Sequence, residues 1–351
     1  NNRIIDGVIQ LRSEVGNQED FTVDIELENL VSNLGVIVGD TTVRTQANSL
    51  FRSGDILFGR LRPYLNKWWL ANTDGVKSGE IWALYPKNEG SNRFIYSLIQ
   101  TEKFLTYVNL TSGTKMPRAD WSVIKNNSID IPKLSEQTQI GDFFQKIDQV
   151  IELQQKALDT ARAYKQSMLQ KMFPQKGEKV PRVRFAGFSG DWEDYALHKI
   201  TNRLDNLRKP VTASERVLGT TPYYGANGIQ DYVQGYTHEG EHILVAEDGA
   251  NNLRDYPIQY VEGKIWVNNH AHVLAAKASC DIKFLSYALK RINFIPFLVG
   301  GGRAKLNAHI MMQIKVRIPK IEEQTAIGNF FQKLDQQIEQ QAQKLATYQQ
   351  L

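Results

Sequence analysis

The chain contains one long motif twice. Residues 131–152 read IPKLSEQTQIGDFFQKIDQVIE and residues 318–339 read IPKIEEQTAIGNFFQKLDQQIE, so 16 of 22 aligned positions are identical at a constant offset of 187 residues. A self-match at a fixed period indicates one architectural unit that is used twice. Because the offset is about half of the 351 residues, we predict a two-fold tandem repeat, which suits a target that itself has two parts.

Composition limits the class of protein. A length of 351 residues with 42% hydrophobic side chains is typical of two or three folded domains. The single cysteine, Cys280, excludes a disulfide framework and a four-cysteine zinc site and fits a reducing cytosol, so we expect a cytoplasmic protein. The sequence contains no run of 18 apolar residues, and we therefore expect no membrane span.

Strand-rich and helical segments alternate along the chain. Clusters of Gly, Asn, Asp and Ser between short apolar runs are typical of strands and turns, whereas stretches rich in Gln, Lys, Ala and Leu are typical of helices. The expected parts are a first globular domain at 1–132, a long helix at 133–173, a linker at 174–190, a second globular domain at 191–319 and a second long helix at 320–351. Residues 1–132 hold 14 Lys and Arg against 15 Asp and Glu, and residues 174–319 hold 19 against 14, so the second half is the basic one.

Both long helices carry a seam with the alternating steps of four and three that are typical of a coiled coil. The seam residues are Ile140, Phe144, Ile147, Ile151, Gln154 and Leu158 in the first helix and Ile327, Phe331, Leu334, Ile338, Gln341 and Leu345 in the second. Gln154 and Gln341 are equivalent by the 187-residue offset. A polar seam residue can fix the register of a helix pair. Alternatively, each Gln lies at the edge of the seam and reaches water.

The shared seam predicts that the two helices pair with each other in an antiparallel arrangement. A helix of about 40 residues, at ~1.5 Å per residue, is roughly 60 Å long. The expected fold is therefore α+β, with two mixed α/β domains separated by two long antiparallel coiled-coil helices and related by pseudo-two-fold symmetry. In such a fold the helices would act as a ruler that sets the spacing of the two domains.

Several ordered motifs resemble those of one known family. They are IPKLSEQTQIGDFF and its second copy, the helix end KQSMLQKMFP, and the restart VPRVRFAGFSGDWEDYALHKI, with YYGANGIQDYV, ILVAEDGAN and KIWVNNHAHVL in the second domain. Over essentially its whole length, the chain resembles the specificity subunit of type I restriction–modification enzymes.

The resemblance implies a division of labour between this chain and its partners. Each globular part would be a target-recognition domain that reads one half of a bipartite, asymmetric site in double-stranded DNA. The helices would dock two methyltransferase subunits, and the assembly would recruit restriction subunits. The chain itself would catalyse nothing and hold no cofactor, since S-adenosylmethionine would belong to the methyltransferase subunits, and ATP and Mg²⁺ to the restriction subunits.

The sequence departs from the family pattern at both ends. The restart VPRVRFAGFSGDWE has no counterpart ahead of the first domain. The second helix stops at Leu351, which is equivalent to Tyr164, whereas the first helix continues to Phe173. We therefore expect that the first recognition domain lacks its N-terminal header.

In the first domain, two loops combine cations with aromatic or small residues. The candidate DNA-binding residues are Arg60, Arg62, Tyr64 and Lys67 in GRLRPYLNKWW, and Thr114, Lys115 and Arg118 in TSGTKMPRADW. Arg and Lys side chains can reach phosphates or guanine edges. The alternatives are a cationic strand edge that discourages aggregation and a surface turn with solvated charges.

In the second domain, the candidate DNA-binding residues lie in turns. They are Tyr223, Tyr224, Asn227, Asn251, Asn252, Arg254, His270, Arg303 and Lys305. The loop VGGGRAKLNAH, with the last two of these, precedes the final strand as TSGTKMPRADW does in the first domain. Asn can pair with adenine in the major groove, although Asn is also an ordinary turn residue.

Other functions are disfavoured by the sequence. His270 and His272 share one face of a strand, but no third metal ligand stands out, so we expect no metal site. Asp255, Glu262 and Lys264 loosely fit a D…ExK nuclease pattern, but the stretch YVEGKIWV is typical of a hairpin turn. No GxxxxGK[ST] nucleotide-binding loop occurs. The remaining alternative function is a coiled-coil scaffold without DNA specificity.

Overall fold

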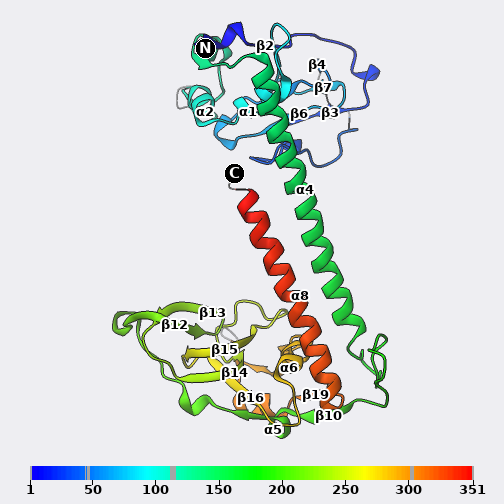
Figure 1. Ribbon diagram of the computed structural model, residues 1–351, viewed down its shortest axis with the longest axis vertical. Coiled ribbons are helices and arrows are strands. Elements are labelled where there is room, and N and C mark those ends of the chain that lie inside the picture. Colours follow the sequence, from blue (N-terminus) through cyan, green and yellow to red (C-terminus); the bar gives the residue numbers. More distant parts are fainter. Residues whose placement is uncertain (1, 44, 46–47, 111–115, 301–303, 350–351) are drawn as a thin grey trace. The chain divides into compact units, whose positions relative to one another are not determined.

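The computed structural model describes residues 2–43, 45, 48–110, 116–300 and 304–349. The chain divides into two compact units, Asn1–Leu153 and Gln154–Leu351, each with its own hydrophobic core (Figure 1). Within these described residues, no helix combines the length and the apolar character that a membrane crossing requires.

The first unit is built from three small sheets and three short helices. A four-stranded antiparallel sheet has the order β2 (Ile9–Leu11), β8 (Ile81–Pro86), β5 (Ile56–Gly59), β6 (Trp68–Leu70). A second sheet has the order β3 (Asp24–Ile25), β7 (Gly75–Lys77), β4 (Ser49–Phe51), and β1 (Asn2–Ile4) pairs with β9 (Ser128–Asp130). The helices are α1 (Asn92–Leu98), α2 (Glu102–Asn109) and α3 (Trp121–Ile124).

The core of the first unit is aromatic. Phe58 of β5 lies between Trp68 and Trp82, with ring centroids 6.4 Å and 6.2 Å away, and Phe104 of α2 meets it edge-on. All four side chains are buried. Because apolar side chains in consecutive residues of β5 cover both faces, the strand occupies the centre of its sheet, and its C-terminal end is held in a fixed position.

The second unit contains one larger sheet. Its order is β11 (Thr201–Arg203), β16 (Ala271–Ala276), β14 (His238–Ala246), β15 (Ile258–Val267), β12 (Leu218–Gly225), β13 (Gly228–Val233). Two strand pairs flank it, β10 (Glu193–Ala196) with β19 (Lys315–Ile318) and β17 (Leu298–Val299) with β18 (Lys305–Leu306). The short helices are α5 (Leu197–Ile200), α6 (Ile282–Leu289) and α7 (Ala308–Gln313).

The interpretation of YVEGKIWV as a hairpin turn is wrong. Glu262 and Lys264 lie inside β15, which pairs with β14 over eight positions. The strand continues because Gly263 lies opposite Gly240, and both have positive φ angles, 89° and 111°. Glycine adopts this conformation without a steric penalty, so the pair bends the ribbon without ending it.

The two long helices are α4 (Leu134–Lys171, 38 residues) and α8 (Ile321–Tyr348, 28 residues). Each starts with a close approach to the short helix of its own unit. An added Cβ at Gly141 would lie 2.8 Å from the backbone nitrogen of Phe94, and one at Gly328 would lie 2.8 Å from that of Phe284. Glycine at this position of the repeat is therefore required by helix packing.

The glutamine that both copies of the repeat contain closes the same junction. In the second unit the Gln324 amide donates to the Pro319 carbonyl and accepts from the Asp281 nitrogen at the start of α6. In the first unit the Gln137 amide donates to the Pro132 carbonyl and accepts from the Ser91 nitrogen at the start of α1. Each glutamine is buried, so the motif EQTxIG encodes a strand–helix junction.

Within the second unit, the last part of α4 runs antiparallel to α8 (Figure 1). The Lys165 ammonium forms an ion pair with Asp335. Phe173, just after α4, lies 6.1 Å from Phe331, which precedes Asp335 by one helical turn. Because Lys165 lies beside Asp335 and the later residue Phe173 lies beside the earlier residue Phe331, the two segments are antiparallel.

The predicted seam serves more than helix pairing. Ile327 and Phe331 are fully buried in the core of the second unit, and Leu334 packs against that core. Ile140 likewise packs on the core of the first unit, whereas Phe144 is 38% exposed. Ile140, Ile327, Phe331 and Leu334 thus pack on the core of their own unit, and the seam as a surface for helix pairing stays a prediction.

The two seam glutamines are half-buried. The side-chain carbonyl oxygen of Gln341 is buried and accepts no hydrogen bond from the described residues. This oxygen therefore does not reach water, and the interpretation that each seam glutamine reaches water fails for the Gln341 oxygen.

The segment 174–190, expected to be a linker, packs against the second unit. Phe185 meets Phe330 edge-on with a centroid distance of 5.7 Å, and the Arg184 guanidinium forms two hydrogen bonds of 2.7 Å with the buried Glu323 carboxylate. These contacts fix the segment although it contains no long helix or strand.

Candidate nucleic-acid interface

Two loops of the first unit that were predicted separately lie side by side. Leu61 forms an isolated antiparallel bridge with Arg118, and the Arg62 nitrogen donates to the Pro117 carbonyl at 2.8 Å. Thr114 and Lys115 lie outside the described residues. The candidate residues of GRLRPY and of the following loop therefore belong to one surface.

The tip of this surface is strained and exposed. Arg62 and Asn66 have φ angles of 50° and 51°, in the left-handed region that side chains other than glycine rarely adopt. Between them Tyr64 is 56% exposed. Strained residues that surrounding structure holds in place concentrate at functional sites. Lys67 does not share this role, because its ammonium donates to the Leu27 carbonyl at 2.8 Å.

The cations of the first unit differ in how far they are neutralised. The Arg118 guanidinium binds Glu80 through Nε and Nη2, with a shortest distance of 2.7 Å, and holds the pKa of Glu80 below its usual range. The Arg60 guanidinium has no hydrogen bond or ion pair with a described residue, and its Nε is buried. Its Cζ lies 5.9 Å from the Trp82 ring centroid.

In the second unit, three candidate turns meet. The Asn227 side chain donates to the Gly249 carbonyl and accepts from the Asn251 nitrogen, both at 2.9 Å. Asp248, next to Gly249, forms an isolated antiparallel bridge with Lys305. The β12–β13 turn, the β14–β15 loop and β18 therefore form one cluster. Arg303 lies outside the described residues.

The asparagines of this cluster build the loops. The Asn252 side chain accepts from the nitrogens of Arg254 and Asp255, which closes a turn, and leaves the Arg254 side chain exposed. Because the side-chain oxygens of Asn227 and Asn252 are bonded within the protein, the turn interpretation holds for both.

The prediction that Tyr223 binds DNA is wrong. Its side chain is 1% exposed, and its hydroxyl bonds the backbone of Val211. On strand β12 its neighbour Tyr224 points to the other face, where it lines a cavity. The strand alternation separates the two tyrosines, and the sequence did not show which face was buried.

A network of charges underlies the loop cluster of the second unit. Glu247 binds Arg208 at 2.7 Å and Lys305 at 3.0 Å, and His272 binds Asp205 at 2.7 Å. Both ring nitrogens of the buried His272 face acceptors, because Nε2 lies 2.8 Å from the Leu306 carbonyl. The network ties together the elements that carry the loops.

The same group resembles a metal site in its composition. Asp205, Glu247 and His272 offer ligand atoms within 4.8 Å of one another. However, Arg208 and Lys305 occupy the free directions of Glu247. Two cations bound to one carboxylate favour an ion-pair network over a metal centre. His270, in contrast, faces Asp248 and not this group.

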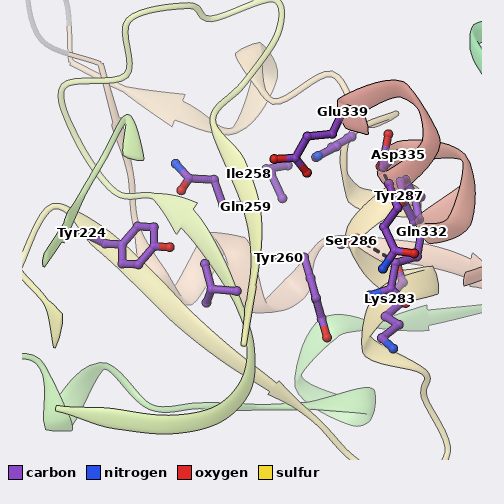
Figure 2. A pocket seen from close by; sticks show the side chains of 13 residues that line it. Tyr224, Ile258, Gln259, Tyr260, Lys283, Ser286, Tyr287, Gln332, Asp335 and Glu339 are labelled. Atoms are coloured by element: carbon purple, nitrogen blue, oxygen red, sulfur yellow. Dashed lines mark hydrogen bonds between the residues drawn. The ribbon is translucent and has the colours of Figure 1, made fainter. Parts of the chain in front are cut away.

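A cavity of about 420 Å³ lies elsewhere in the second unit, between β15, α6 and α8. Figure 2 shows Tyr260 of the sheet near Lys283 and Tyr287 of α6, with Asp335 of α8 beside Tyr287 and Glu339 on the same helix. The Tyr287 hydroxyl donates to Asp335 at 2.7 Å. Two lysines of the lining, Lys283 and Lys290, balance the two carboxylates of α8, so the charges give this cavity no preference for a phosphate backbone.

Comparison with known proteins assigns the repeated unit. The family described as type I restriction modification DNA specificity domain matches residues 24–161 and again residues 189–347. The chain belongs to this family. Its two specificity domains account for the internal repeat, and both include the start of a long helix.

Curated relatives match parts of the chain. A Haemophilus influenzae protein, provisionally named as the type I restriction enzyme specificity subunit S.HindORF215P, is 50% identical over 141 residues, which are 40% of this chain and 36% of the relative. The EcoprrI specificity subunit of Escherichia coli is 28% identical over 32% of this chain and 28% of its own length. The chain thus spans about a third of the length of these two relatives. The MjaVIII specificity subunit of Methanocaldococcus jannaschii is 22% identical over 76% of this chain and 72% of its own.

Solved structures share the fold. The S subunit of a type I system from M. genitalium superposes with a TM-score of 0.69 at 16% identity and covers 99% of this chain and 92% of its own. A chain from a structure on complex assembly and conformational transition of the type I R-M system gives a TM-score of 0.56 at 16% identity, with 100% and 94% covered. The α+β fold with two long helices is thereby confirmed.

The sequence missed the residues that neutralise the candidate cations in both specificity domains. Glu80 lies 38 residues before Arg118, and Glu247 likewise lies far before Lys305 in the sequence, so no local motif joins either pair. The 187-residue offset could have identified the loops that occupy equivalent places in the two domains. It relates Leu61 to Asp248 and Arg118 to Lys305, and these are the two isolated bridges that the structure contains at equivalent places.

Proposed function

We propose that this chain is the non-catalytic, sequence-specific DNA-recognition subunit of a type I restriction–modification enzyme. Each specificity domain would read one half of a bipartite, asymmetric duplex site. The observation that carries the proposal is the pair of equivalent bridges, Leu61 with Arg118 and Asp248 with Lys305, which in both domains hold a cationic residue beside the loop that follows the central strand. Such loops can supply phosphate and base contacts.

The partners in this proposal are two methyltransferase subunits and, in a restricting assembly, restriction subunits. Support comes from α4, where the apolar side chains Phe143, Val150 and Leu153 are 59%, 36% and 65% exposed. An exposed apolar stripe on a charged helix is typical of an interaction surface. The relatives named above as specificity subunits and the type I assembly among the solved structures fit the same assignment.

Chemistry would reside in those partners. The methyltransferase subunits would bind S-adenosylmethionine and extrude a target adenine from the stack, since reactions on a base require its extrusion. The restriction subunits would use ATP and Mg²⁺. Because the substrate is duplex DNA of the cell, we place the assembly in the cytoplasm. The long helices would act as the ruler between half-sites.

Methylome sequencing tests the proposal. Cells that carry this chain with its neighbouring methyltransferase are compared with cells that lack only this chain. We expect a chain-dependent, gapped, two-part adenine motif. If an active methyltransferase gives the same methylation in both strains, DNA targeting is refuted and the scaffold alternative remains.

A further inference from the structure

The residue that follows the central strand of each specificity domain lies at equivalent places. In the first domain this residue is Arg60, after β5. Its nitrogen donates to the Glu80 carbonyl at 2.9 Å and its carbonyl accepts from the Ala119 nitrogen at 2.8 Å. In the second domain it is Glu247, after β14. Its nitrogen donates to the His270 carbonyl at 2.8 Å, and its carbonyl accepts from the Leu306 nitrogen at 2.7 Å. We call Arg60 and Glu247 the strand-end residues.

The two strand-end residues carry opposite charges, and the surrounding charges are redistributed. In the first domain the loop cation Arg118 pairs with Glu80, which lies on the neighbouring turn. In the second domain the loop cation Lys305 pairs with the strand-end residue Glu247 itself. The carboxylate that neutralises the loop cation thus lies on the neighbouring turn in the first domain and at the strand end in the second. As a result, Arg60 forms no ion pair with a described residue, although its charge acts at longer range on the carboxylates of Glu80 and Asp120.

Arg60 is held in a defined orientation. Hydrogen bonds fix its backbone on both sides, and its guanidinium lies over the buried Trp82 indole, with Cζ 5.9 Å from the ring centroid. Arg60 as a whole is half-buried, its Nε is buried without a hydrogen-bond partner, and the two Nη atoms form no hydrogen bond with a described residue. A guanidinium that lies against an aromatic ring and forms no ion pair can offer its outer donors to a ligand.

The neighbourhood favours an electron-rich ligand. Lys77 is buried beneath the same region, where burial and, to a smaller extent, the Arg60 charge lower its pKa to about 8. The exposed side chains of Arg62 and Tyr64 stand on the adjoining loop. Flexible, exposed cations suit phosphates, which carry no sequence information, whereas a fixed guanidinium suits a base edge.

We propose that Arg60 is a specificity-determining residue that reads one guanine in the major groove by donating to its O6 and N7 atoms. The proposal rests on the DNA-recognition function proposed above. Guanine is the base that presents two acceptors side by side, and Arg is the side chain whose fork matches them. Glu247 excludes this contact in the second domain, so the two domains read different bases from the same structural position.

The test uses the full chain with its methyltransferase in cells and reads the methylated motif. Arg60→Gln should convert one specified G·C pair in one half-site to a degenerate position, with roughly ten- to hundred-fold lower discrimination there, and leave the other half-site unchanged. Arg60→Lys keeps the charge without the fork and should lose the same guanine. The matched control is Arg3→Gln, an exposed arginine of β1 that is not among the candidate DNA-binding residues, which should leave every specified base and the level of methylation unchanged.

Other outcomes overturn the proposal. An unaltered motif in Arg60→Gln, or a uniform fall in methylation at all sites, would make Arg60 dispensable or a phosphate contact. Retention of the guanine in Arg60→Lys would show that charge alone acts. A melting temperature equal to the wild-type value excludes unfolding as the cause. If the wild-type chain directs no gapped motif, the proposed function itself fails, which is a separate result.

Discussion

The sequence GxFFQK occurs at the start of both long helices, yet its phenylalanines have different environments. In the second unit Phe331 is fully buried and Phe330 packs against Phe185. In the first unit the equivalent residues, Phe144 and Phe143, are 38% and 59% exposed. The same residues at the same helical positions therefore do not determine their own burial.

The difference arises from the segments that cover the helix. Phe331 contacts Phe173 and Tyr287, with ring centroids 6.1 Å and 5.2 Å away. Phe173 lies just after α4. The residue of α1 that corresponds to Tyr287 is Ser97, because Phe94 and Phe284 meet the equivalent glycines. Burial is thus decided by residues outside the repeat.

The largest test of this comparison is the removal of the buried ring. Phe331→Ala should destabilise the second unit by about 3–5 kcal/mol, since the cavity would remain in a packed core. Phe144→Ala, at an exposed position, should cost about 0.5 kcal/mol. Hydrogen exchange of peptides from each unit measures the two effects separately. Equal losses of protection in both units would contradict the difference in burial.

The glutamate of the repeat gives a second test. Glu323 is buried and binds Arg184, whereas its equivalent in the first unit, Glu136, is exposed. Glu323→Gln should cost about 3 kcal/mol, because it leaves a half-buried guanidinium with a weaker partner. Glu136→Gln should change the unfolding midpoint in urea little, and serves as the matched control. A similar midpoint shift in both variants would show that segment 174–190 does not hold the second unit together.

These pairs show why sequence could predict the repeat and not its packing. The motif EQTxIG predicts the strand–helix junction in both copies because its glutamine and glycine act on adjacent elements. Phe185 and Arg184 lie in a stretch that reads as a linker, since Pro, Gly and Lys are typical of exposed segments. Their contacts with α8 join residues about 140 positions apart, which no periodicity reveals.

The candidate interface divides in a similar way. Composition and the 187-residue offset indicated the loops with Arg118 and Lys305, and the structure places both in equivalent bridges. The sequence did not predict which carboxylate neutralises each cation. That carboxylate lies on the turn in the first domain, as Glu80 does, and at the strand end in the second, as Glu247 does. Tyr223 was misassigned since alternation along a strand does not indicate which face is covered.

The smallest predicted effect concerns a feature that the two units share. Gly141→Ala and Gly328→Ala each place a methyl group 2.8 Å from a backbone nitrogen of the neighbouring short helix, so the helices must move apart. Each substitution should destabilise its own unit by about 1–3 kcal/mol, to a similar extent. Gly79→Ala, which meets no atom within 4 Å and has no positive φ angle, is the control. Unequal losses, measured by the same hydrogen exchange, would mean that the covering segments also set the helix crossing, and that the junction is not an independent module of the repeat.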